Sequence, residues 1–161
     1  MKKNDLRAHV AIAVRACQDK KAANISILQL DEQASGFTDY FVICSGANPR
    51  QIQAIADDVD EKLSAAGLEP THREGYNQAE WVLLDYVDFV LHIFSEQARK
   101  FYDLERLWKT ATRLELSDLE KPVRIAAAKR AIAHKKAAKS ITRSAAKKSA
   151  AKKSSRTRKG S

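Results

Sequence analysis

Two long segments carry apolar residues at every third or fourth position, which predicts amphipathic helices over residues 4–22 and 48–67. Asn48 followed by Pro49 is typical of a helix start, because an asparagine side chain caps free N–H groups and proline suits the first helical turn. The apolar positions that define the two faces are Leu6, Val10, Val14, Cys17, Ile52, Ile55, Val59 and Leu63.

Short runs rich in β-branched and aromatic residues lie between and after these helices, and they predict strands. EWVLLDY at 80–86 and DFVLHIF at 88–94 are separated by one residue and predict a β-hairpin. The other predicted strands are residues 24–30, 39–46 and 68–75.

A final helix is predicted over residues 95–108, with Ser95 as its cap and Phe101, Leu104 and Leu107 or Trp108 along one face. The order of helices and strands favours an α/β fold. We expect a mixed sheet of roughly five strands, flanked by helices.

The segment FTDYFVICSG, residues 37–46, raises the question of a phosphate site, because a turn between a strand and a helix is where many α/β enzymes hold phosphate. The chain contains neither GxxxxGK[ST] nor GxGxxG. A nucleotidyltransferase would also need two carboxylates two positions apart on one strand, whereas Asp85 and Asp88 are three apart. We therefore expect a structural turn, in which Gly46 frees the chain to turn and Asn48 caps the next helix.

Alternation along EWVLLDY assigns its side chains to two faces of the sheet. Both faces are largely apolar, so one must cover the core and the other must carry a helix or a partner protein. A tryptophan on a strand fits a buried core, but an exposed tryptophan is a residue type that dominates protein interfaces. The pattern leaves both interpretations open. Trp81, Leu83 and Asp85 share one face, and Val82, Leu84 and Tyr86 share the other.

Charge divides the chain into two parts. Residues 121–161 contain 15 lysines and arginines and no acidic residue, so residues 1–120 carry a net charge of −6 although the whole chain carries +9. We expect a folded domain at residues 1–112 and a basic tail, rich in Lys, Ala and Ser and largely disordered, at residues 113–161.

Such a tail is expected to bind RNA or DNA without sequence preference, because its positive charges release counterions from phosphates. The tail has no aromatic residue that could stack on bases, so sequence-specific recognition is not expected. The lysines that we expect to contact nucleic acid are Lys135, Lys136, Lys147, Lys148, Lys152 and Lys153.

Other kinds of site find little support. Cys17 and Cys44 lie in apolar surroundings without further ligands at metal-binding spacing, which indicates buried thiols and neither a disulfide framework nor a metal site. No cofactor motif is present. No apolar run approaches the roughly 18 residues of a membrane span, and the first residues do not form a convincing signal peptide. We therefore expect a cytoplasmic protein.

Four longer motifs follow one another along the chain: FTDYFVICSG, QIQAIADDVDEKL, EGYNQAEWVLLDYVDFVLHIF and ARKFYDLERLW. Together they resemble the Iojap-like ribosomal silencing factor family. The resemblance covers about residues 5–110 and leaves the basic tail outside. It implies an α/β fold similar to that of nucleotidyltransferases but without their catalytic residues.

The resemblance implies a translational repressor rather than an enzyme. We expect the chain to bind the large ribosomal subunit through the protein numbered fourteen in that subunit, and to block joining of the small subunit sterically. Relatives in organelles aid assembly of the large subunit, which makes a biogenesis role a neighbouring expectation. The resemblance also implies association as a homodimer, and the basic tail could reach ribosomal RNA.

By the same resemblance, the partner-binding surface maps onto Trp81, Leu83, Asp85 and Tyr86. Family members often have glycine in the turn after LLDY, where this chain has Val87. Because a β-branched residue resists positive φ, we expect a locally different turn here.

Two alternatives remain open at this stage. In the first, the chain is a nucleotidyltransferase or phosphohydrolase that uses Ser45, Asp85 and Asp88. In the second, it is a non-specific nucleic-acid-binding protein whose tail carries the function and whose folded domain is a dimerising base.

Overall fold

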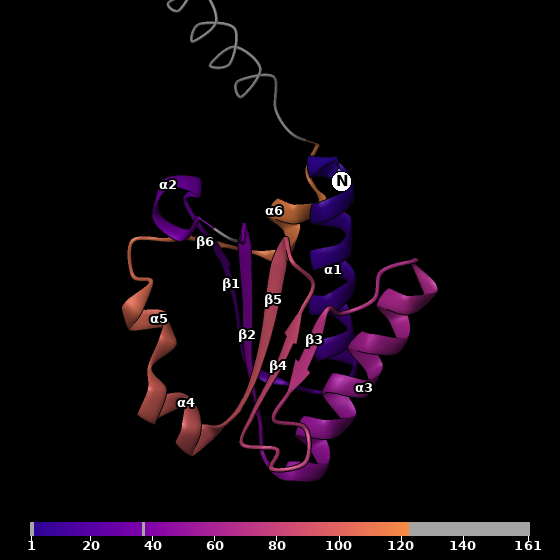
Figure 1. Ribbon diagram of the computed structural model, residues 1–161, viewed down its shortest axis with the longest axis vertical. Coiled ribbons are helices and arrows are strands. Elements are labelled where there is room, and N and C mark those ends of the chain that lie inside the picture. Colours follow the sequence, from indigo (N-terminus) through magenta and orange to yellow (C-terminus); the bar gives the residue numbers. More distant parts are fainter. Residues whose placement is uncertain (1, 37, 123–161) are drawn as a thin grey trace, which may run out of the picture. The chain divides into compact units, whose positions relative to one another are not determined.

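A six-stranded sheet with helices on both faces forms the part of the chain that the computed structural model describes, residues 2–36 and 38–122 (Figure 1). The helices are α1 (Lys3–Asp19), α2 (Glu32–Ser35), α3 (Pro49–Ala65), α4 (Glu96–Tyr102), α5 (Leu104–Leu107) and α6 (Leu116–Glu120). The strands are β1 (Ala23–Gln29), β2 (Tyr40–Gly46), β3 (His72–Glu74), β4 (Trp81–Asp85), β5 (Phe89–Ser95) and β6 (Thr112–Leu114).

The sheet has the strand order β3-β4-β5-β2-β1-β6. Strands β2 and β5 at its centre run parallel, and every other neighbouring pair is antiparallel. The prediction of a mixed α/β sheet is therefore confirmed, as is the β4–β5 hairpin. In the described part of the chain, no helix is both long enough and apolar enough to cross a membrane.

The sheet has one strand more than expected, β6, which pairs with β1 at one edge. Three residues are too few to show an alternating pattern, so the sequence did not reveal this strand. The boundary expected at residue 112 falls at the start of β6, and α6 then continues the described structure to Glu120. The basic tail and its lysine pairs, beyond residue 122, lie outside the described residues.

The two faces of the sheet are covered by different helices. Figure 1 shows α1, α3 and α6 on one side and α4 and α5 on the other. We call these sides the α1/α3 face and the α4/α5 face. The α1/α3 face holds the larger core, in which the side chains from the sheet include Tyr40, Val42, Cys44, Val82, Leu84, Phe89, Leu91 and Ile93. Cys17 and Cys44 are free and buried, as predicted.

The turn between β2 and α3 confirms one prediction and corrects another. The Asn48 side chain accepts a hydrogen bond from the backbone N–H of Gln51 at 2.8 Å, and Pro49 opens the helix. Gly46, however, does not serve to free the chain, because its φ lies outside the left-handed region. A Cβ at this position would lie 2.5 Å from Cγ1 of Ile52, so glycine is needed for the close approach of α3.

The helix predicted over residues 95–108 is broken into two. Ser95 caps α4 by accepting a hydrogen bond from the N–H of Ala98 at 3.1 Å, as expected. Asp103 then adopts a φ of 44°, which ends α4 and redirects the chain into α5. The predicted common face is therefore wrong: Phe101 is exposed while Leu104 packs against the sheet.

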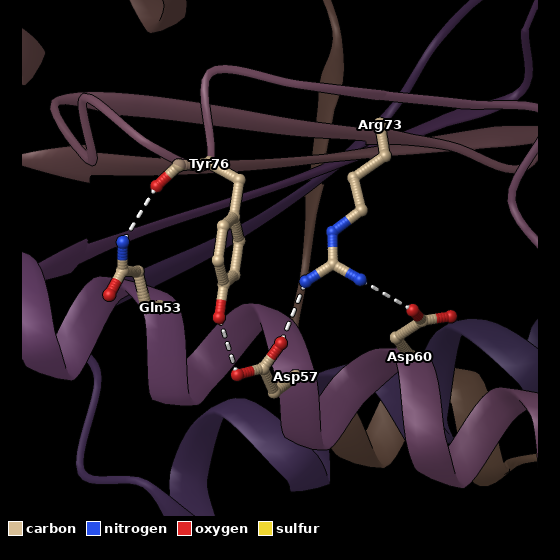
Figure 2. Close-up of polar contacts among 5 residues, drawn as sticks. All are labelled: Gln53, Asp57, Asp60, Arg73 and Tyr76. Atoms are coloured by element: carbon tan, nitrogen blue, oxygen red, sulfur yellow. Dashed lines mark hydrogen bonds and ion pairs between the residues drawn. The ribbon is translucent and has the colours of Figure 1, made fainter.

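A polar cluster attaches the edge strand β3 and the loop after it to α3 (Figure 2). Arg73 donates to Asp57 at 2.7 Å and to Asp60 at 2.8 Å, and its guanidinium lies 4.4 Å from the centre of the Tyr76 ring. The Tyr76 hydroxyl donates to Asp57, and Gln53 donates to the Tyr76 carbonyl at 2.9 Å. These contacts hold the chain just before it enters β4.

The β4–β5 turn contains a strained residue. We expected Val87 to avoid positive φ, but its φ is 71°, in the left-handed region that favours glycine. The Asp85 side chain accepts a hydrogen bond from the Val87 N–H at 2.8 Å, which stabilises this turn. The Val87 side chain is 54% exposed, so it gains little burial in return.

We expect Val87→Gly to raise the free energy of unfolding by about 1 kcal/mol. Glycine removes left-handed strain of about 1–2 kcal/mol, and its greater loss of backbone entropy on folding offsets only part of this gain. Val87→Ala is the matched control, since it shortens the side chain but still places a Cβ at positive φ. Urea denaturation should separate the two variants. Equal stabilities would show that Val87 is not strained.

Candidate partner-binding surface

The α4/α5 face of the sheet is covered far less completely than the other. Helices α4 and α5 have 7 and 4 residues, whereas α1 and α3 have 17 each. On β4, alternate side chains point to this incompletely covered side. These are Trp81, Leu83 and Asp85, and all three are partly exposed. The structure therefore brings these three predicted residues together on one face, as their alternation requires.

The fourth predicted residue, Tyr86, lies elsewhere. Its side chain is 2% exposed and belongs to the core on the α1/α3 face, where its ring stacks on Phe89 at 4.8 Å. Burial raises the pKa of its hydroxyl, which has no hydrogen-bond partner in the described part of the chain. Tyr86 thus stabilises the hairpin from the α1/α3 face and is not available on the candidate surface.

A continuous series of rings crosses the α4/α5 face, and we call it the aromatic row. Its neighbouring ring centres are 4.6–5.9 Å apart. Most contacts are tilted or edge-on, which is the arrangement that aromatic quadrupoles prefer. The aromatic row consists of Trp108, Phe41, His92, Trp81, Tyr102 and Phe101.

One end of the row reaches solvent. At this end Phe101 is 79% exposed and Tyr102 is 47% exposed. Leu107 on α5, the chain neighbour of Trp108 at the other end, is 74% exposed. A contiguous patch of exposed large apolar side chains is typical of a binding surface, whereas single ones are common on any protein. Our site prediction did not include these residues. The pattern within the segment did not reveal them, because Phe101, Leu104 and Trp108 stand at helical spacing and so predict one buried face.

Ser45 and Asp85 of the enzyme alternative do not come together. Ser45 on β2 is opposite Phe94 on β5, whereas Asp85 on β4 is opposite Val90. Phe94 and Val90 are four residues apart on β5, so Ser45 and Asp85 are separated by about 13 Å along the strand direction. The Ser45 hydroxyl is buried and accepts a hydrogen bond from Arg99 at 2.9 Å, so it is engaged in the fold.

The Asp85 carboxylate also has a structural role. Asp85 caps its own turn through the Val87 N–H, and its other oxygen lies 3.7 Å from Nδ1 of His72. Within the described residues, no three His, Cys, Asp or Glu side chains are grouped so that they could hold a metal ion.

His92 is the buried member of the aromatic row between Phe41 and Trp81, and it is only 4% exposed. Its Nδ1 accepts a hydrogen bond from the indole N–H of Trp81, with 3.1 Å between the nitrogens. Burial lowers the pKa of His92 from 6.5 to about 4, because the charged imidazolium would lose its hydration. The imidazole is therefore neutral at physiological pH.

This low pKa makes the stability of the fold depend on pH. The unfolded chain protonates His92 below about pH 6.5, whereas the folded chain does so only near pH 4. The stabilisation is thus complete above pH 6.5 and is lost as the pH falls toward 4. We expect the free energy of unfolding to be about 2 kcal/mol lower at pH 5 than at pH 7.

Chemical denaturation at both pH values measures this effect. His92→Leu should abolish this part of the pH dependence, while the three other histidines remain in the variant as an internal background. If the variant loses as much stability between pH 7 and 5 as the natural chain does, His92 is not responsible.

Comparison with known proteins adds to this geometry. The family model described as "Ribosomal silencing factor during starvation" matches residues 3–156. The match includes most of the basic tail, which the four motifs had left outside the resemblance.

Two relatives carry ribosomal names. The chain is 40% identical over 109 residues to "Ribosomal silencing factor RsfS" of Bacillus subtilis (strain 168), covering 68% of this chain and 89% of that protein. It is 26% identical over 102 residues to "Mitochondrial assembly of ribosomal large subunit protein 1" of Mus musculus, covering 62% of this chain and 44% of that protein.

A solved structure agrees with the fold. The crystal structure of a Bacillus halodurans protein matches with a TM-score of 0.58 and 39% sequence identity, covering 66% of this chain and 95% of that one. With the family match over most of its length and a relative of the same name at 40% identity, the chain belongs to the ribosomal silencing factor family.

Proposed function

We propose that this protein is a cytoplasmic, non-enzymatic repressor of translation. It binds the large ribosomal subunit through that subunit's protein number fourteen and keeps the small subunit from joining. The observation that carries the proposal is the solvent-exposed end of the aromatic row, on a sheet face that α4 and α5 leave incompletely covered, in a member of this family.

The proposed docking surface combines strand β4 with α4 and α5. Trp81 and Leu83 form its base, where they pack against the smaller core of the α4/α5 face. Aromatic anchors surrounded by less important contacts are typical of binding hot spots. We define the docking surface as Trp81, Leu83, Phe101, Tyr102 and Leu107.

The mechanism that we propose requires no chemical step. A domain that occupies the place of the small subunit prevents joining by excluded volume alone. Repression then depends on the fraction of large subunits that carry the protein, and so on its concentration relative to the dissociation constant. This agrees with the separation of Ser45 from Asp85 along the sheet.

Charge supports the same mode of binding. The folded part is acidic, with a net charge of −6 over residues 1–120, and ribosomal proteins are generally basic, so complementary potentials would speed their encounter. The 15 positive charges of residues 121–161 suit neighbouring ribosomal RNA. A tail that binds RNA while the domain binds protein would increase the overall affinity through effective concentration.

A second role is favoured by the name of the mouse relative, which refers to assembly of the large subunit. The same docking surface would serve both roles, since a protein bound to immature large subunits also keeps small subunits away. A second copy of this chain could cover the exposed rings as well. In that case dimer formation would compete with ribosome binding, and free dimers would dominate at high protein concentration.

The docking surface is tested by sedimentation of purified large subunits with Trp81→Ala and Phe101→Ala. Loss of an interface anchor typically costs about 2 kcal/mol, so we expect each variant to bind about 30-fold more weakly and to lose its block of subunit joining. Phe101 is the safer variant for the fold, because most of its side chain is already in solvent.

Val87→Ala serves as the matched control, since it shortens an exposed apolar residue at the hairpin turn, outside the docking surface. It should bind like the natural chain. If Phe101→Ala and Trp81→Ala also bind normally, the partner does not use this face.

The tail is tested by replacing Lys135, Lys136, Lys147, Lys148, Lys152 and Lys153 together by glutamine. If these lysines contact phosphates, the slope of log affinity against log salt concentration should become shallower by up to about 4. The control changes Ser140, Ser144 and Ser149 to alanine, which leaves the charge intact.

Large-subunit binding measured from 50 to 300 mM salt gives the slope. An unchanged slope in the lysine variant would show that the tail does not contact RNA. If instead a tail peptide alone binds large subunits as tightly as the whole chain does, the nucleic-acid-binding alternative takes the place of our proposal.

A further inference from the structure

Trp81 is a member of the docking surface whose side-chain N–H is bonded to a buried residue. Its indole N–H donates to Nδ1 of His92, a side chain that is 4% exposed. The two residues belong to adjacent antiparallel strands, in which Trp81 is opposite Phe94 and Leu83 is opposite His92. The bond therefore runs diagonally across the hairpin, beneath the surface.

This hydrogen bond determines the tautomer of the neutral imidazole. Because Nδ1 accepts, the proton of the neutral ring must lie on Nε2. That atom is buried and has no hydrogen-bond partner among the residues that the structure describes. A leucine at this position would avoid burying an unpaired polar group, so the imidazole does not serve the core alone.

The neighbours of Trp81 restrict its ring without selecting its orientation. The indole stacks on Phe94 at 5.0 Å and contacts Tyr102 at 4.6 Å. These contacts are apolar, and an indole that is turned over between them would keep much of its contact area. Only the hydrogen bond to His92 distinguishes the orientations, because an indole N–H facing a docked partner would lose its hydrogen bond to water.

We propose that His92 is a positioning residue for docking: by accepting the indole N–H of Trp81, it turns the carbon edge of the ring outward, so that the partner meets an apolar anchor that needs no hydrogen bond. This inference rests on the proposed function, and it adds the chemical character of the partner's surface that contacts Trp81. The part of the partner that covers Trp81 is an apolar pocket without an acceptor for the indole.

A matched pair of variants tests the role of the acceptor. His92→Asn keeps an acceptor, because the side-chain carbonyl oxygen takes a place close to that of Nδ1. His92→Leu has the same branching of heavy atoms as the asparagine variant but no acceptor. Binding of both variants to purified large subunits is measured twice, once with Trp81 present and once combined with Trp81→Phe, which removes the indole N–H.

We expect His92→Leu to weaken binding about tenfold, because the released N–H must be desolvated again on docking, and His92→Asn to stay within about threefold of the natural chain. In the Trp81→Phe background the two variants should bind equally. If asparagine and leucine are equally harmful, or if the leucine variant binds normally, or if the difference persists without the indole N–H, the proposal is overturned.

A further measurement needs no substitution at Trp81 or His92. The indole N–H of Trp81, distinguished from that of Trp108 by a Trp108→Phe variant, should exchange slowly with solvent in nuclear magnetic resonance spectra. Rapid exchange would overturn the proposal even if the His92 variants failed to fold. Slow exchange in a chain that does not bind large subunits would mean that the proposed function is wrong and that His92 serves only the fold.

Discussion

The parallel pairing of β2 with β5 is the constraint on which the rest of the structure depends. Both strands are apolar on both faces, with all seven residues of β2 buried, so the sheet must be covered from two sides. Parallel neighbours also cannot be joined by a tight turn, and the connection through α3, β3 and β4 supplies both a cover and two further strands.

The helices on the two faces of the sheet differ in how much they bury, so that one face serves stability and the other leaves a surface for binding. On the α1/α3 face, two long helices bury a core that extends along the sheet. On the α4/α5 face, the short helices leave rings in contact with one another and partly with solvent. A sheet face that is nearly but not fully covered is stable as a monomer and still gains by burying its remaining apolar surface against a partner.

Particular residues show where sequence patterns were sufficient. Period-two alternation correctly divided Trp81, Leu83 and Asp85 from Tyr86, and the caps at Asn48 and Ser95 followed from local chemistry. The patterns failed at Asp103, where one residue at positive φ splits a helix, and at β6, which exists only because β1 offers it an edge. Gly46 was recognised as special, but the reason is its contact with Ile52 near the start of α3, which rules for turn residues do not predict.

By itself, the sequence determined the α/β class, the central hairpin, the charge boundary and the family resemblance, because each depends on periodicity, composition or motif order along the chain. Only the tertiary structure decided which apolar residues are exposed and which are core. Exposure depends on what other segments cover, and the break at Asp103 left Phe101 and Leu107 uncovered while Tyr86 was enclosed. The bond between Trp81 and His92 likewise required two strands to be placed in register, which no pattern within either strand specifies.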